Sequence, residues 1–544
     1  MSVTTMDTTR TMARSSSSSV PREWLRRDLG PGSNAHTTRF RRRAFAAAFG
    51  AIIAVASIAV SAQSWHFEPS VVWQETLTNN VNLSPASSAR ADLVTQVTPT
   101  LTISEKGPRT SLVGDIAAPI LLYVKTGAEN NQIYPFVNLL GTVEGVEKFF
   151  FIEGAVNVSQ QYFTPFGAQP QSLANATQNR YTSATYRISP YIQGATPGNY
   201  QYEIRNNNSW TNVSGAPIST NNAYTDEWKG KLSSPLAPFG WALDYDWTNV
   251  KFTDQNPTIT QLARGTLRWQ ADPLLQFDVD GGYEDNQYPF VNYRGAIYGA
   301  GLQWNPTSRT KVVGNWEHRF FGSSYLFTFD HRTPLSAITA QASRNTTSYP
   351  QQYLSVPATG NVPLLLDFLL QSRIPDPTAR LAAINQIIQN QGLPGSLTAP
   401  VNLYTQQTYL LENASVTYGI LGARNNVLLT GFYAKSQPIT GAGTPLPGLF
   451  APGNNNTQTG ASVVWTYNIT TMVALNATGT YIHTVANAPL VGTSNQGYFL
   501  LGLTAPLSAK TTLTAGARYQ VLHSDVSVQY NEAAIFAGLT YVFK

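Results

Sequence analysis

The sequence predicts an all-β fold, namely a transmembrane antiparallel β-barrel of about 20–22 strands. Three observations indicate this fold. The chain begins with a segment of secretory type, it carries few charged residues, and from about residue 66 its apolar residues recur at every second position. A short helical insertion in a long loop interrupts this pattern near residues 361–392.

The first element is a leader that spans residues 1–62. Four arginines at positions 39–43 form a positive region, residues 44–60 are apolar, and small residues lead up to Ala62. This order is typical of a secretory signal peptide that is cleaved after Ala62. An uncleaved membrane anchor is the alternative. Residues 63–544 are then expected to form the barrel.

Composition limits the class of protein. Only 12% of the 544 residues are charged, whereas soluble proteins carry about 25%. The leader holds nine Arg and three acidic residues, so the formal net charge of +5 belongs to the leader and predicts no nucleic-acid partner. The chain has no Cys, which excludes disulfides and thiolate metal sites. We expect no cofactor and no metal.

Five segments show the alternation most clearly. Trp241, Leu243 and Tyr245 represent their apolar face, and the other face is charged; the segments are 226–234, 241–249, 263–269, 275–283 and 312–320. A soluble sandwich or propeller would give the same alternation. The leader, the low charge and the C-terminal strand favour a barrel in the outer membrane of a Gram-negative bacterium. Its apolar face would contact lipid and its charged face would line the lumen.

The charged faces predict a ladder of opposite charges on the inner wall. If hairpins fold about residues 238, 255 and 272, Lys229 and Lys231 lie beside Asp246 and Asp244, while Arg264 lies beside Asp246, Asp278 and Asp280. Such a ladder either fixes strand register or forms a selectivity belt for a permeating solute. Its members are Lys229, Lys231, Asp244, Asp246, Arg264, Arg268, Asp278, Asp280, Glu317 and Arg319.

The helical insertion lies in the longest predicted loop, residues 348–402. Asp376 is a suitable N-cap and Gly392 a suitable stop. One helix face carries Leu381, Ile384, Ile387 and Ile388. This apolar face could form a plug in the lumen, form a lid on top of it, or pack on neighbouring loops without a gating role.

The last strand is apolar almost to the end of the chain. Leu539, Tyr541 and Phe543 share one face, and Lys544 follows them. A closed barrel pairs its last strand with its first. We expect these three residues to form the signal that the outer-membrane assembly machinery recognises.

The sequence offers no pattern for catalysis. It contains no Gly-x-Ser-x-Gly, no His-Glu-x-x-His and no phosphate-binding loop. Histidines such as His483 and His523 lie near predicted strand ends, and no surrounding motif marks them. We therefore expect a protein that is not an enzyme.

Five stretches carry a resemblance to a known family: 67–85, 91–109, 304–333, 372–394 and 507–520. They include "WNPTSRTKVVGNWEHRFFGSSYLFTFDHRT" and "SRIPDPTARLAAINQIIQNQGLP". In order and spacing the chain resembles the outer-membrane proteins associated with the PEP-CTERM/exosortase system of Gram-negative bacteria. The resemblance implies a barrel linked to exopolysaccharide production, without a catalytic site.

These observations give two functional hypotheses. The first is a channel or conduit component, with exopolysaccharide or its export proteins as partners besides lipid and the assembly machinery. The second is a structural or surface-binding barrel with a plugged lumen, in which polar loops such as 206–222 and 451–459 anchor polysaccharide or sorted proteins.

Overall fold

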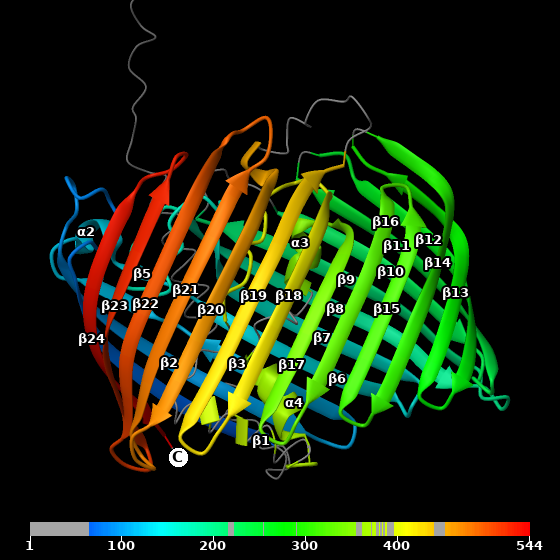
Figure 1. The fold of residues 1–544 in the computed structure, drawn as a ribbon, viewed down its shortest axis with the longest axis horizontal. Coiled ribbons are helices and arrows are strands. Elements are labelled where there is room, and N and C mark those ends of the chain that lie inside the picture. The colour runs from blue at the N-terminus through cyan, green and yellow to red at the C-terminus, as the bar shows by residue number, and fades with distance from the viewer. Residues whose placement is uncertain are drawn as a thin grey trace, which may run out of the picture. The chain divides into compact units, whose positions relative to one another are not determined.

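The fold is a closed antiparallel β-barrel, as predicted (Figure 1). The computed structural model describes residues 65–215, 222–253, 255–289, 291–354, 362–371, 373–376, 380, 383–384, 387–388, 397–439 and 452–543. The leader and its cleavage site therefore lie outside the described residues. Among the described residues, no helix is long and apolar enough to cross a membrane.

Twenty-four strands form one sheet. In the first half of the chain they are β1 (Trp65–Thr78), β2 (Asp92–Lys106), β3 (Thr110–Ala117), β4 (Ile120–Tyr123), β5 (Gln132–Ile133), β6 (Phe136–Val146), β7 (Phe150–Tyr162), β8 (Arg180–Ala195), β9 (Gln201–Ser214), β10 (Ala223–Ser233), β11 (Phe239–Phe252) and β12 (Thr258–Asp272).

The second half contributes β13 (Leu275–Gln287), β14 (Asn292–Thr307), β15 (Thr310–Arg319), β16 (Gly322–Arg332), β17 (Ser336–Thr347), β18 (Tyr409–Leu421), β19 (Asn425–Pro438), β20 (Asn456–Asn468), β21 (Ala474–Ala486), β22 (Gly492–Pro506), β23 (Thr511–Ser524) and β24 (Tyr530–Val542). The short helices are α2 (Gly127–Asn130), α3 (Tyr349–Leu354), α4 (Val362–Leu370) and the 3-10 turn η1 (Pro452–Asn454).

The barrel has 22 strand positions, because β3 and β4 both pair with β2 and share one position, and β5 and β6 share the next. The barrel closes where β24 pairs with β1, with Leu539 opposite Trp73 and Tyr541 opposite Val71. The backbone N–H of Phe543 donates to the carbonyl of Pro69 at 2.8 Å. The predicted strand count and closure are confirmed; the role of this strand in assembly stays a prediction.

The two faces of the wall differ as the alternation requires. On β19, Leu428 is 0% exposed and points inward, whereas Leu429 is 41% exposed and points outward. Aromatic rings band the outer face. Near the short turns the ring centroids of Phe239 and Trp269 lie 6.4 Å apart, and those of Trp269 and Phe277 lie 5.7 Å apart. Such bands mark the boundaries of a membrane-spanning belt.

One expectation about loops is wrong. The stretch 206–222 was predicted to be a polar loop, but its first half belongs to β9, and residues 456–459 belong to β20. The amide of Asn206 donates to Asp226 on β10 at 2.8 Å, and that of Asn207 donates to Glu227 at 2.6 Å. Cross-strand bonds of this kind let asparagines occupy strands that their intrinsic preference disfavours.

Candidate functional site

The charged face of β10–β15 lines the inside of the barrel. Lys229 lies opposite Asp246 and Lys231 opposite Asp244, in the register that the sequence predicted. Arg264, however, lies opposite Asp244, two residues away from the Asp246 that was expected. The turn between β11 and β12 is therefore centred differently from the assumed position.

The next pairing also differs. Arg264 lies opposite Gly282, so that Asp280 is a diagonal neighbour and Asp278 is too far along the strand. Asp278 instead faces Arg268. The reason is an irregularity at Gln270–Asp272, where the register between β12 and β13 shifts. A bulge at a strand end displaces every later pair, and alternation alone does not reveal it.

The inner charges form a network that reaches across several strands. Arg264 Nη2 lies 2.6 Å from Glu317 Oε1, although β12 and β15 are separated by two strands. On the two intervening strands, Gly282 lies opposite Arg264 and Gly299 lies opposite Glu317. Since glycine has no side chain, neither position blocks the approach of the two ions. Long side chains can therefore lie flat across the wall. This pairing replaces part of the predicted strand-by-strand ladder.

Two further ion pairs differ from a simple ladder. Arg319 Nη2 lies 2.7 Å from Glu284 Oε2 on β13, and Lys229 Nζ lies 2.9 Å from Glu227 Oε1 on its own strand. The predicted ladder residues thus line one wall. Several of them, however, form ion pairs with residues other than their nearest cross-strand neighbour. Within the described ranges, no group of three or more His, Asp or Glu side chains is placed to hold a metal ion.

This charged wall is partly open. The side chain of Lys229 is 38% exposed and that of Arg264 is 26% exposed. Leu326 on β16, opposite Asn315, is 41% exposed although its position in the pairing directs it inward. Exposed side chains on an inner wall show that the described part of the chain does not fill this side of the lumen.

The opposite wall, from β18 to β24, is covered by chain. Inward side chains such as Thr430, Ser462, Asn476 and Gln520 are buried, whereas outward neighbours such as Val463 are exposed. Two connections account for this burial, and we name them by their origin. The β17–β18 segment comprises residues 348–408, and the β7–β8 segment comprises residues 163–179.

The β17–β18 segment carries the predicted helical insertion. Leu366 and Leu369 of α4 pack in one cluster with Ala337 on β17, Leu428 on β19 and Val464 on β20. All three partners are buried residues on the inner face. In Figure 1, α4 accordingly lies near the end of the barrel that carries the short turns.

The predicted plug residues belong to the same cluster. Ile384 is buried in it, and Ile387 and Ile388 pack against it. Leu381 lies outside the described residues. Arg380 Nε forms an ion pair with Asp367 Oδ1 of α4 at 2.6 Å. These contacts place α4 and the described residues of the segment against the inner wall rather than above the barrel as a lid.

The β7–β8 segment was not predicted to enter the barrel. Its residue Asn175 is fully buried against β23 and β24. Arg518 Nη2 and Gln520 Nε2 both donate to Asn175 Oδ1, at 3.1 and 3.0 Å. Asn175 Nδ2 donates to Glu532 Oε1 at 3.1 Å. Asn175 is thus one of several contacts that fix the segment to the opposite wall, since Gln496 Nε2 on β22 also donates to the carbonyl of Gln169 at 2.8 Å.

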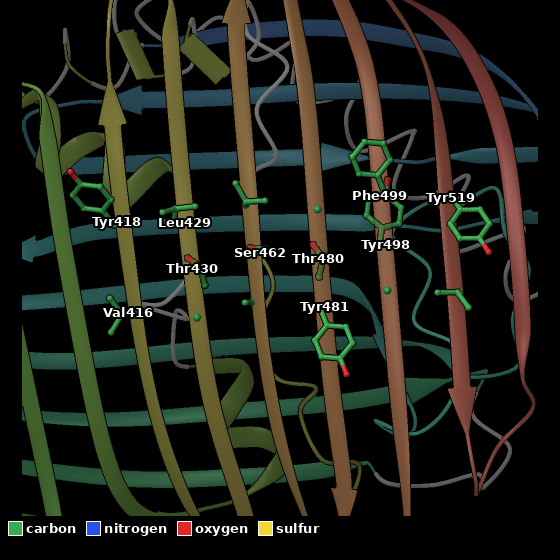
Figure 2. A pocket seen from close by; sticks show the side chains of 16 residues that line it. Val416, Tyr418, Leu429, Thr430, Ser462, Thr480, Tyr481, Tyr498, Phe499 and Tyr519 are labelled. Atoms are coloured by element: carbon green, nitrogen blue, oxygen red, sulfur yellow. The ribbon is translucent and has the colours of Figure 1, made fainter.

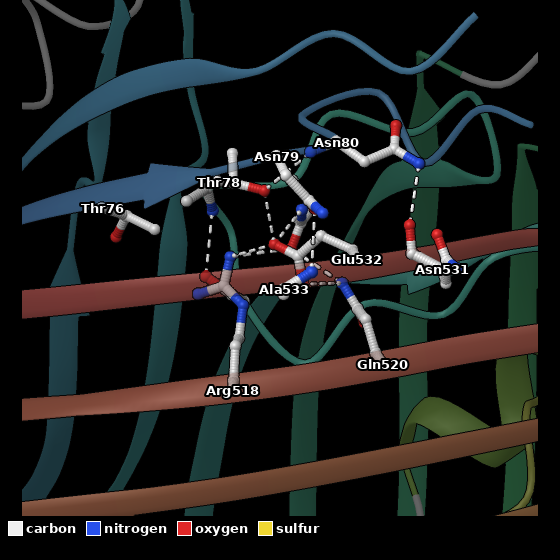
Figure 3. Close-up of polar contacts among 12 residues, drawn as sticks. Thr76, Thr78, Asn79, Asn80, Arg518, Gln520, Asn531, Glu532 and Ala533 are labelled. Atoms are coloured by element: carbon white, nitrogen blue, oxygen red, sulfur yellow. Dashed lines mark hydrogen bonds and ion pairs between the residues drawn. The ribbon is translucent and has the colours of Figure 1, made fainter. Parts of the chain in front are cut away.

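Asn175 completes a buried ion pair. Arg518 Nη2 lies 3.0 Å from Glu532 Oε1, and the two side chains are 3% and 0% exposed. Thr78 on β1 donates to the same carboxylate at 2.7 Å, so the network also bridges the closing strands. Figure 3 shows Arg518 and Gln520 reaching from β23 toward Glu532 on β24. We call these five residues, Thr78, Asn175, Arg518, Gln520 and Glu532, the buried latch.

One sequence signal could have indicated the β7–β8 segment. Residues 163–179 are rich in Gly, Pro, Asn and Gln and show no alternation. They connect β7 to β8, and they are much longer than the turn that connects β6 to β7. An ordered loop of this length without secondary structure is uncommon and usually has a function. The sequence does not show which wall such a loop contacts.

Together these features define the class of protein. A closed barrel with an apolar, aromatic-banded outer face and a charged inner face is a transmembrane β-barrel of the outer membrane of Gram-negative bacteria. Its lumen is half covered by two inner segments, and one charged wall remains open.

No family model and no curated protein matches the chain. Several solved structures of outer-membrane proteins are similar to it. The siderophore receptor PirA from Pseudomonas aeruginosa is similar at 7% identity, with 88% of this chain and 81% of that chain covered and a TM-score of 0.41. The FrpB iron transporter from Neisseria meningitidis is similar at 8% identity, with coverages of 88% and 82% and a TM-score of 0.45. The outer membrane protein opdK from Pseudomonas aeruginosa is similar at 7% identity, with coverages of 88% and 99% and a TM-score of 0.33.

Proposed function

We propose that the barrel is a conduit for a hydrophilic solute, which passes along the charged wall of β10–β16. The observation that carries this proposal is the asymmetry of the lumen. Lys229, Arg264 and Leu326 are exposed on one wall, whereas Arg518 and Glu532 are buried on the other. Among the described residues, the first wall is therefore the more accessible of the two to water and solute.

The chemistry of this wall suits a polyhydroxylated solute. Acidic and basic side chains alternate along it, as at Lys231, Asp244 and Arg264, so their long-range fields largely cancel. What remains is a dense surface of hydrogen-bond donors and acceptors. The sequence resemblance to proteins linked with exopolysaccharide production supports such a polymer, or its export proteins, as the partner.

The two inner segments then set the width of the passage. Both are fastened by buried contacts, the β17–β18 segment through its Leu and Ile cluster and the β7–β8 segment through the buried latch. In this form the conduit is narrow. Passage of a polymer requires that at least one segment moves away from the wall.

Single-channel recording in planar bilayers tests the proposal. Purified full-length protein is compared with a variant that lacks residues 361–392 and with a control that lacks residues 441–451, in the β19–β20 connection. We expect a larger conductance only when 361–392 is removed, and we expect a neutral oligosaccharide to reduce that current. A correctly folded barrel that stays silent in all three forms would contradict a conduit.

The second candidate is a surface-binding barrel with a permanently filled lumen. It is favoured by the number of fastening contacts, since a mobile plug does not need a side chain such as Asn175 that is hydrogen-bonded to a buried ion pair of the wall. This alternative predicts polymer binding by whole cells without conductance. Polymer binding that persists while every variant is silent would favour it over the conduit.

A further inference from the structure

A hollow lies on the outer, lipid-facing wall over β18–β23. It has a volume of about 800 Å³ and an almost entirely apolar lining. Its floor consists of four small residues on four neighbouring strands: Gly431, Ala461, Gly479 and Gly497. Figure 2 shows Tyr418 and Tyr519 on opposite sides of the hollow, with Tyr481 and Phe499 between them. The side chains of Leu429, Val463 and Phe499 are exposed beside it.

A polar row borders the hollow on one side. Thr459, His483, Asn495 and His523 lie opposite one another in turn across β20, β21, β22 and β23. Thr459 and Asn495 are two residues from the floor residues Ala461 and Gly497, and His483 is four residues from Gly479. His483 Nδ1 lies 2.7 Å from Asn495 Oδ1, and the Tyr481 hydroxyl donates to the same oxygen at 2.8 Å. We call this row the polar rim.

The rim lies toward the end of the barrel opposite the short turns, because β21 begins after such a turn at Ala474 and runs toward Ala486. Short turns face the periplasm in barrels of this class. The rim is therefore on the side of the outer leaflet, and the hollow lies below it within the hydrocarbon belt.

We infer that this face binds one outer-leaflet glycolipid, with an acyl chain in the hollow and the headgroup at the polar rim. An apolar hollow in contact with hydrocarbon is matched by an acyl chain. A rim of imidazole, amide and hydroxyl groups is matched by the hydroxyls and phosphates of a sugar headgroup.

The floor residues allow a sharp test. A Cβ atom at Gly431 would meet only the Gly460 carbonyl at 3.9 Å, and one at Gly479 would meet Val463 Cγ1 at 3.4 Å. Leu at either position fills the hollow without disturbing the backbone. Gly281 is the matched control, since it faces lipid on β13 and its Cβ would meet only the Ile297 carbonyl at 3.9 Å.

Native mass spectrometry of the full-length, detergent-purified protein measures the bound lipid. Hexa-acylated lipid A and phosphatidylglycerol are added separately to delipidated protein. We expect wild type and Gly281→Leu to retain lipid A. We expect Gly431→Leu/Gly479→Leu to retain at least about tenfold less, because an acyl chain that loses the burial of two methylenes binds about tenfold more weakly. His483→Leu/Asn495→Leu is expected to lose the preference for lipid A over phosphatidylglycerol. Heat-dependent gel mobility checks folding, and either single Gly variant carries the test if the double variant does not fold.

Three outcomes would overturn the inference. The first is equal retention of both lipids by wild type, and the second is equal retention of lipid A by the filled and the control variants. The third is a wild-type dimer that the filled variant abolishes, which would identify a second copy as the occupant. None of these outcomes depends on conductance, so the inference and the proposed conduit can fail separately.

Discussion

The buried latch makes a quantitative prediction. Glu532→Gln keeps the size of the side chain but leaves Arg518 as an unpaired charge that is 3% exposed. Removing one partner of a buried ion pair typically costs about 3–5 kcal/mol, because the remaining ion is desolvated without compensation. We expect the free energy of unfolding to fall by that amount.

Two controls separate charge burial from general damage. Glu129→Gln breaks the Arg90–Glu129 ion pair, whose side chains are 49% and 61% exposed, and such pairs contribute about 0–1 kcal/mol. The double variant Arg518→Met/Glu532→Leu removes both ions, so part of the stability should return, although Thr78 and Asn175 lose their common acceptor.

The assay has a thermodynamic and a local readout. Urea unfolding in detergent is followed in both directions, because barrels can unfold irreversibly and then only rates are comparable. The chain contains no Cys, so Ala174→Cys gives a unique label next to Asn175. A soluble maleimide should label it in the Glu532→Gln background and not in wild type. If Glu532→Gln and Glu129→Gln lose equal stability, or if Ala174→Cys stays protected in both backgrounds, the latch does not hold the β7–β8 segment.

Three further predictions concern the two faces and the plug. In vesicles, Asp244→Cys should react with a charged thiol reagent and Tyr245→Cys should not, because only the first faces the lumen; equal labelling would contradict the assigned faces. Ile384→Asp should raise single-channel conductance by displacing the β17–β18 segment at a cost of several kcal/mol, whereas Leu364→Asp, on the exposed side of α4, should not. Glu317→Gln frees the charge of Arg264 and should raise the anion-to-cation permeability ratio about twofold to fivefold, measured as a reversal potential; an unchanged ratio would exclude this wall from the passage.

Alternation predicted the two faces of the wall, and the leader, the low charge and the C-terminal strand favoured a barrel over a soluble sandwich. The side chains of Leu243 and Tyr245 point to lipid and those of Asp244 and Asp246 point inward, because a strand places successive side chains on opposite faces. The pairing of Lys229 with Asp246 followed from the length of one turn. The alternation within each strand thus determines which residues face the lumen, and the length of the short turn fixes the register between β10 and β11.

The partners of the inner charges could not be predicted in the same way. The Arg264–Glu317 contact depends on two intervening glycines and on a bulge at Gln270–Asp272. The position of Asn175 depends on which strands the 17-residue β7–β8 segment contacts on the opposite wall. Both are contacts between segments that are distant along the chain, and no local periodicity encodes them.

The polarity of the inner wall gives a physical reason for the half-open lumen. Covering Arg264 and Asp244 with chain would remove ions from water at a cost of several kcal/mol per ion. The wall of β18–β23 presents mainly small polar and apolar residues such as Thr430, on which a segment can pack at little cost. Where that side of the barrel does carry ions, at Arg518 and Glu532, the β7–β8 segment supplies a hydrogen-bonding amide. The distribution of charge therefore determines where the inner segments can lie, and the wall that they leave uncovered marks the path that we assign to the solute.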